Sequence, residues 1–87
     1  MRRRANYRSR IEIFASILET VANKGDMGTT KMAYHSRLSY NQVCKHIVPL
    51  LEGQLLDQHD RFYSITEKGR KFLGLYVDMA EMIKSMR

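Results

Sequence analysis

The stretch Leu38–Leu51, LSYNQVCKHIVPLL, predicts one helix with two dissimilar faces. Ser39 and Gln42 stand at the spacing of a capping box, in which the serine hydroxyl accepts from the backbone N–H three residues on. At about 100° per residue, amides and a cation fall on one side and apolar residues on the other. The polar side holds Asn41, Gln42 and Lys45, with His46 at its margin, and the apolar side holds Val43, Cys44, Ile47, Leu50 and Leu51.

A helix that is buried on one side and carries amides and a lysine on the other suits the major groove of DNA. Asn and Gln can pair bidentately with adenine, and Lys can donate to guanine. A polar outer face is also the ordinary state of a surface helix, so the neighbouring segments must decide. Because Pro49 removes a helix hydrogen bond and disfavours helical geometry at Val48, we expect a kink there and base contacts only before it.

Composition indicates one small globular domain. The chain has 87 residues, of which 44% are hydrophobic and 28% charged, as is typical of a folded protein. No apolar run approaches the roughly 20 residues of a membrane span, and the arginines at the start are not followed by the apolar segment of a signal peptide. The single cysteine, Cys44, cannot form an internal disulfide and agrees with a reducing compartment. We therefore expect a cytoplasmic protein.

The formal net charge of +6 lies in the first half of the chain. Residues 1–46 hold nine Lys and Arg against three acids, whereas residues 47–87 hold six of each. This asymmetry favours nucleic acid as a partner, with an anionic membrane surface second and simple solubility as the alternative. Residues 1–9 contain four arginines and are expected to be a flexible arm that follows phosphates or enters a minor groove, or else a tail that only adds charge.

A first helix is predicted after the arm. Ser9 and Glu12 have capping-box spacing, and Lys24 and Gly25 provide an end signal. The apolar stripe between them is wide, which implies burial on more than one side, including against the C-terminal helix.

A short second helix is predicted over residues 31–36, capped by Thr29 or Thr30. Only a few residues separate it from the Ser39 cap of the next helix. Two short helices with so brief a link form a helix-turn-helix, in which the second of the pair is presented to the major groove.

Short strand-like runs at residues 55–57 and 62–65 predict a β-hairpin. A hairpin directly after a helix-turn-helix is the wing of a winged helix. Arg61 at its tip can meet phosphate or a minor groove, or can instead pair with Asp57 or Asp60.

The last helix is expected to begin after Thr66 and to run towards Met86. Its apolar residues repeat at intervals of four and three, which is a heptad seam of fewer than three heptads. Pairing with the same helix of a second subunit is the favoured interpretation, and packing on the first helix of its own chain is the alternative. The seam consists of Phe72, Tyr76, Met79, Ile83 and Met86.

Three segments carry a family resemblance. Leu-Ser-Tyr at residues 38–40, Gly-Gln-Leu-Leu at 53–56 and Tyr-Ser-Ile-Thr-Glu-Lys-Gly at 63–69 resemble the small basic archaeal winged-helix proteins of the Sulfolobus ten-kilodalton chromosomal-protein type. The likeness covers roughly Arg10 to the C-terminus. It implies a double-stranded DNA-binding winged helix that dimerises through antiparallel C-terminal helices.

Carried over by position, the resemblance implies that residues 39–46 and the wing tip at residues 59–61 face DNA, and that residues 72–86 form the dimer seam. This chain differs from the family pattern in Pro49, in a shorter last helix, in a longer arginine arm and in an acidic wing.

The spacing of Cys44 and the three histidines does not fit a metal site, and we expect Cys44 to be a core residue. No nucleophile, phosphate-loop or dinucleotide motif occurs, so we expect neither an enzyme nor a cofactor.

The sequence thus predicts a mainly α protein with a small β-hairpin. It comprises a basic arm (residues 1–9), a winged helix-turn-helix (10–66) and a C-terminal dimerisation helix (67–87). We expect a homodimeric, nucleoid-associated regulator or architectural protein that binds double-stranded DNA; the alternative is a winged helix that binds another protein. The candidate DNA-binding residues are Arg2, Arg3, Arg4, Lys31, Arg37, Ser39, Tyr40, Asn41, Gln42, Lys45, His46, His59 and Arg61.

Overall fold

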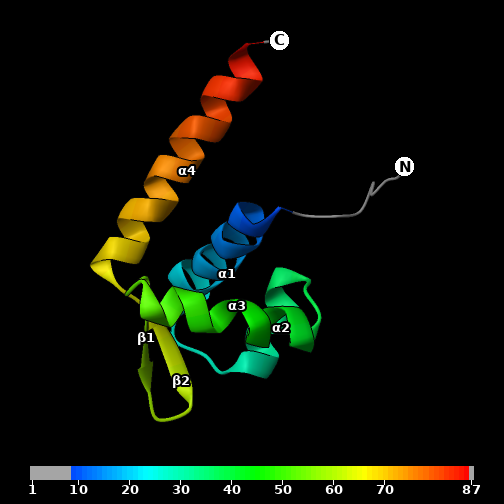
Figure 1. Cartoon of the computed structure of the whole chain (residues 1–87), viewed down its shortest axis with the longest axis vertical. Helices are drawn as coiled ribbons and strands as arrows, with labels where there is room; N and C mark the ends of the chain where they lie inside the picture. Colours follow the sequence, from blue (N-terminus) through cyan, green and yellow to red (C-terminus); the bar gives the residue numbers. More distant parts are fainter. Residues whose placement is uncertain (1–8, 87) are drawn as a thin grey trace.

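The computed structural model describes residues 9–86 as four helices and one hairpin (Figure 1). The predicted arm, with Arg2, Arg3 and Arg4, lies outside the described residues apart from Ser9. The elements are α1 (Arg10–Lys24), α2 (Thr29–Ser36), α3 (Tyr40–Glu52), β1 (Leu56–His59), β2 (Phe62–Ile65) and α4 (Glu67–Ser85). This order of elements is the mainly α winged helix that the sequence predicts.

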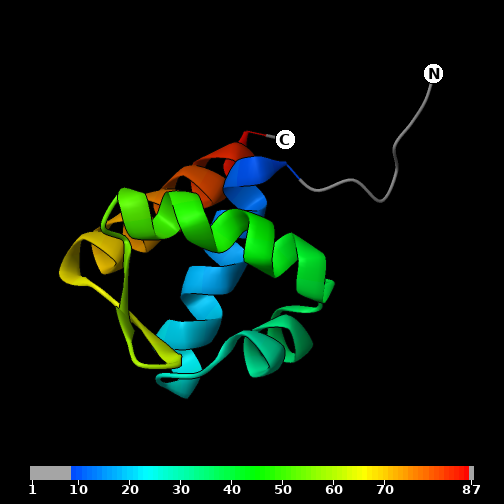
Figure 2. The same ribbon diagram turned by 60° about the horizontal axis from the view of Figure 1, so that its bottom comes forward.

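Helix α1 provides the surface on which the other elements pack. Ile17 and Leu18 in its middle turns are fully buried, and α2, α3, α4 and β2 all contact the helix. Figure 2 shows α3 crossing in front of α1, with the hairpin to one side of it. The wide apolar stripe is therefore explained by burial on more than one side of α1, as predicted, although Ile11 near the start of the helix remains exposed.

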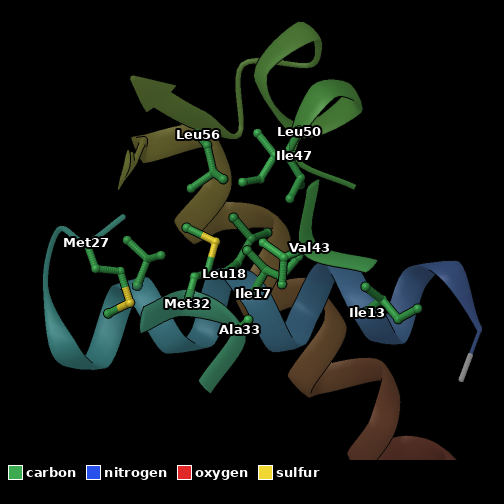
Figure 3. Close-up of a cluster of buried hydrophobic side chains, with 11 residues drawn as sticks. Ile13, Ile17, Leu18, Met27, Met32, Ala33, Val43, Ile47, Leu50 and Leu56 are labelled. Atoms are coloured by element: carbon green, nitrogen blue, oxygen red, sulfur yellow. The ribbon is translucent and has the colours of Figure 1, made fainter. Parts of the chain in front are cut away.

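The core is a single cluster between α1, α2, α3 and the start of β1 (Figure 3). Met32 and Ala33 of α2 face inward, and Leu56 of β1 closes the cluster beside Leu50 of α3. Burying one such side chain fully is worth roughly 1.5–3 kcal/mol, so a few residues on each element decide its position.

Pro49 lies inside α3 without ending it. The helix continues to Glu52, and the Gly53 N–H donates to the Pro49 carbonyl oxygen at 2.9 Å. Gly53 is the C-cap in a right-handed conformation, and it is Gln54 that takes the left-handed one, with φ of 64°. The chain therefore reverses one residue later than a glycine C-cap predicts.

The hairpin is a two-stranded antiparallel sheet in the register Leu56↔Ile65 to His59↔Phe62. It is tied to the helices by one more pair of hydrogen bonds, because Tyr63 exchanges backbone bonds of 2.9 and 3.3 Å with Met27 in the α1–α2 loop. This bridge orients the wing beside α1, and it could not be predicted from local sequence because Met27 shows no strand pattern.

Helix α4 begins on the wing and runs away from it. The Thr66 hydroxyl accepts from the Gly69 N–H at 2.9 Å and donates to the Gln54 carbonyl oxygen at 2.6 Å. This one side chain therefore caps α4 and also links it to the loop between α3 and β1. The first turns pack on the core through Phe72 and Leu73. The last turns extend beyond the body of the domain (Figure 1).

Gly69→Ala is expected to destabilise the protein by roughly 1–3 kcal/mol, because a Cβ there would meet the Leu55 carbonyl oxygen and lie 2.8 Å from Ile65 Cγ1. The matched control is Gly74→Ala in the same helix, where a Cβ meets nothing within 4 Å and should stabilise by about 0.5–1 kcal/mol. Urea unfolding followed by circular dichroism measures both. Equal shifts of the two midpoints would contradict the close approach at Gly69.

Candidate nucleic-acid interface

The turn between α2 and α3 sets the angle of the predicted recognition helix. Arg37 ends α2 in a left-handed conformation (φ 59°, ψ 40°), and the next N–H, of Leu38, donates to the Ala33 carbonyl oxygen at 3.1 Å. Helix α2 itself begins earlier than predicted. Its N-cap is Gly28, with no side-chain cap, so the expected cap by Thr29 or Thr30 is wrong. Lys31 and Arg37 are both exposed.

The predicted capping box of α3 is present. Ser39 Oγ accepts from the Gln42 N–H at 3.0 Å, and the Gln42 side-chain oxygen accepts from the Ser39 N–H at 3.1 Å. A bidentate contact with adenine needs both the oxygen and the amino group of a Gln side chain. While the cap is closed, Gln42 therefore has only its amino group for another partner.

The inner face of α3 is apolar, and the outer face holds the predicted polar residues. Val43, Ile47 and Leu50 are buried, whereas Asn41 and Lys45 are exposed. At about 100° per residue, Asn41 and Lys45 point away from the buried side. The structure therefore presents an amide and an ammonium group together on the outside of the helix.

Two residues of α3 lie differently from the prediction. Cys44 is exposed, so its assignment to the core is wrong. Tyr40 lies close to the apolar arc when residues of α3 are placed at about 100° each, and is nevertheless 56% exposed. Both lie on the edge of the apolar arc, where no neighbouring element covers them. A side-chain hydrogen bond with Cys44 raises the pKa of the Tyr40 hydroxyl above its ordinary value.

His46 is half-buried and turns towards α1. Its Nδ1 lies 2.7 Å from the Gln42 carbonyl oxygen, so this nitrogen carries the proton and donates. Its ring meets the edge of the Phe14 ring at a centroid distance of 5.6 Å, and the Arg10 guanidinium lies 5.3 Å from the Phe14 centroid. The histidine thus joins the two helices, and the structure turns its ring towards Phe14 instead of outward.

The wing tip is a tight turn in which Asp60 has a φ of 61°. His59 and Arg61 flank it and are exposed. His59 Nε2 is 2.9 Å from Ser64 Oγ across the hairpin, and Gln58 Nε2 donates to the Asp60 carbonyl oxygen at 3.2 Å. The Arg61 side chain projects from a turn that is stabilised by these two bonds.

The predicted dimer seam divides into two parts. Phe72 and Tyr76 are half-buried, and Tyr76 lines a hollow with Glu12 and Glu19 of α1, so this part meets its own chain as the alternative interpretation predicts. The remaining seam residues lie on the exposed end of α4: Met79, Ile83 and Met86.

Residues 9–86 contain neither a metal site nor a membrane-spanning helix. Within this range, no group of three or more His, Cys, Asp or Glu side chains is placed to hold a metal ion. No helix in the same range is long and apolar enough to cross a membrane.

The arrangement of a two-helix turn, an exposed polar helix face and a hairpin agrees with the family comparison. A family model described as winged helix-turn-helix matches residues 7–84. The chain belongs to this family. The sequence resemblance to the Sulfolobus ten-kilodalton type is thereby confirmed at the level of fold. A comparison with curated proteins found no match.

Solved structures of similar proteins agree with the winged helix-turn-helix assignment. Sso10a-2, a DNA-binding protein from Sulfolobus solfataricus, is 24% identical, with a TM-score of 0.79 over 91% of this chain and 85% of its own. BpsR from Bordetella bronchiseptica, whose DNA binding is regulated by 6-hydroxynicotinic acid, is 20% identical, with a TM-score of 0.73 over 85% of this chain and 61% of its own. A Pseudomonas aeruginosa protein has a TM-score of 0.71 at 20% identity, over 94% of this chain and 59% of its own. These likenesses establish a shared fold.

Ser39→Ala is expected to lower the free energy of unfolding by about 1 kcal/mol, because it leaves the first turn of α3 without its cap. Gln42→Ala should also destabilise, by removing the reciprocal bond to the Ser39 N–H. Asn41→Ala, one residue away and outside the capping box, is the control and should change stability little. Urea unfolding of the three variants tests this, and an equal cost at Asn41 would contradict the role of the box.

Proposed function

We propose that this winged helix-turn-helix protein binds double-stranded DNA with α3 in the major groove. The proposal is carried by the two faces of α3: Val43 and Ile47 are held in the core, and Lys45 is held outward. A helix fixed in this way can approach base edges without unfolding any part of the domain. Asn41 has both its amide groups available for adenine, and Lys45 can donate to guanine or to a phosphate.

The distribution of charge supports the same partner. The excess of basic residues lies in residues 1–46, and within that range the exposed Lys31 and Arg37 lie on α2 and in the turn that follows it. Phosphate contacts of this kind give an affinity that falls as salt rises, because each neutralised phosphate releases counterions. Arg61 at the wing tip would add a contact beside the groove. We assign the arginines of the arm the same role.

We further propose that the protein is a homodimer joined through the exposed end of α4. Six large apolar side chains from Leu75 onward are exposed, Met82 by 67% and Met86 by 79%, and all but Val77 lie on one side of the helix. Apolar groups at this density on one helix favour burial against a partner, and a second copy offers a matching surface. The exposed set on that side is Leu75, Met79, Met82, Ile83 and Met86.

A dimer would present two recognition helices to one duplex. This is how helix-turn-helix proteins read two half-sites, and it suits a transcription regulator or an architectural chromosomal protein in the cytoplasm or nucleoid. The described regulation of DNA binding in BpsR and the DNA binding of Sso10a-2 support this class of function for the present chain. The alternative, a winged helix that binds another protein, is favoured by the exposed apolar end of α4.

Lys45→Glu is expected to weaken duplex binding by about 1–3 kcal/mol and to reduce the slope of log K against log salt, since it removes a contact on the docking face. Lys84→Glu makes the same charge change on α4 and should have a much smaller effect. Fluorescence anisotropy across a salt series measures both. Equal losses would show that the docking face is misplaced, and no binding at low salt would refute the proposal.

Ile83→Glu is expected to convert the dimer to a monomer, because it places a carboxylate inside the proposed seam. Lys84→Glu, about 100° further round the same helix, should leave the dimer intact. Light scattering at micromolar concentration compares the two with the unaltered chain. A monomeric unaltered chain would refute self-association through α4 and favour the protein-binding alternative.

A further inference from the structure

An apolar strip runs along the outside of α3, beside the polar residues. Tyr40, Cys44 and Val48 are spaced four residues apart, so they follow one another along a single line of the helix. All three are exposed, Tyr40 by 56% and Val48 by 54%. Cys44 and Val48 belong neither to the core cluster nor to the capping box of α3. The proposed contacts of Asn41 and Lys45 do not account for them either.

The major groove contains one apolar group that a protein can read. Thymine presents its C5-methyl there, and small apolar side chains contact it, whereas none of the other three bases carries a methyl group at that edge. Resting on the proposed binding of duplex DNA, we propose that Cys44 and Val48 contact thymine methyl groups and so direct the protein to A·T base pairs.

The spacing along α3 fits this assignment. Cys44 and Val48 are about 6 Å apart along the helix axis, at 1.5 Å per residue, which is close to two base-pair steps. Asn41 lies one turn before Cys44 on the same side of the helix, where it can pair with an adenine. The amide and the two apolar groups therefore select the same kind of base pair.

Two neighbours delimit the strip. Tyr40 is exposed one turn before Cys44 and stands at the N-terminal end of the strip. Glu52 is exposed one turn beyond Val48, and its carboxylate would be repelled by phosphates. The part of α3 that approaches DNA therefore ends at Val48.

A protein partner fits the strip less well. A helix docked in a groove uses anchors at intervals of three and four residues, which together form a broad apolar face. Tyr40, Cys44 and Val48 form a single line of exposed side chains, with Asn41 and Lys45 beside it on the outward side of the helix. A single line of methyl-sized contacts matches isolated thymine methyls better than it matches a protein groove.

The test compares two duplexes that differ only in the C5-methyl group. One is an alternating A·T duplex, and the other has deoxyuridine in place of every thymidine. Anisotropy titration of the full chain should show weaker binding to the uracil duplex by about fourfold for each methyl contacted. Equal affinity for both duplexes would overturn the inference while leaving duplex binding intact, and would reassign the strip to a protein partner. No binding to either duplex would refute duplex binding itself.

Variants separate direct contact from an effect of uracil on DNA shape. Val48→Ala should bind the A·T duplex more weakly and lose most of the discrimination against uracil, and Cys44→Ser should reduce it. Val77→Ala changes the same residue type on α4 and should discriminate as the unaltered chain does. Val48 is exposed, so its truncation leaves the core unchanged. If Val48→Ala and Cys44→Ser both keep the full discrimination, the methyl groups act through DNA shape and the inference fails.

Discussion

Contact between α1 and α3 is the interaction on which the rest of the structure depends. Ile17 and Leu18 of α1 are fully buried, and Val43 and Leu50 of α3 are fully buried in the same cluster. Because this packing sets the rotation of α3 about its own axis, it also decides which side chains face outward. A polar residue on the inner face would therefore cost stability and also turn the outward residues away from a partner.

Some residues of α3 bond within the protein, and others remain available to contact DNA. Gln42 closes the cap and His46 braces the helix against Phe14, so much of their hydrogen-bonding capacity is used inside the protein. Groups held by the protein in this way cannot adapt freely to a base. The exposed residues without such contacts include Asn41, Lys45 and Val48, and a mixture of polar and apolar groups of this kind is what the major groove can distinguish.

Helix α4 separates two tasks along its length. Its first turns are fastened by Thr66 and pack on the core through Phe72, so the helix leaves the domain in a fixed direction. Its last turns expose Met82, Ile83 and Met86. In the proposed dimer, the direction in which α4 leaves the domain would set the position of the second subunit. It would therefore also set the distance between the two recognition helices.

Local sequence determined the elements and their caps: Ser9, Ser39 and Thr66 begin helices where predicted, since a capping hydroxyl acts on N–H groups within three residues of it. Periodicity also identified the inner face of α3. Three features were decided only by the tertiary structure. They are which residues at the margin of the α3 apolar face are covered, the backbone bridge between Met27 and Tyr63, and which part of α4 packs on its own chain. Cys44 shows the reason. Helical periodicity places a residue on an arc, but only the neighbours packed across that arc decide whether its margin is covered or left in water.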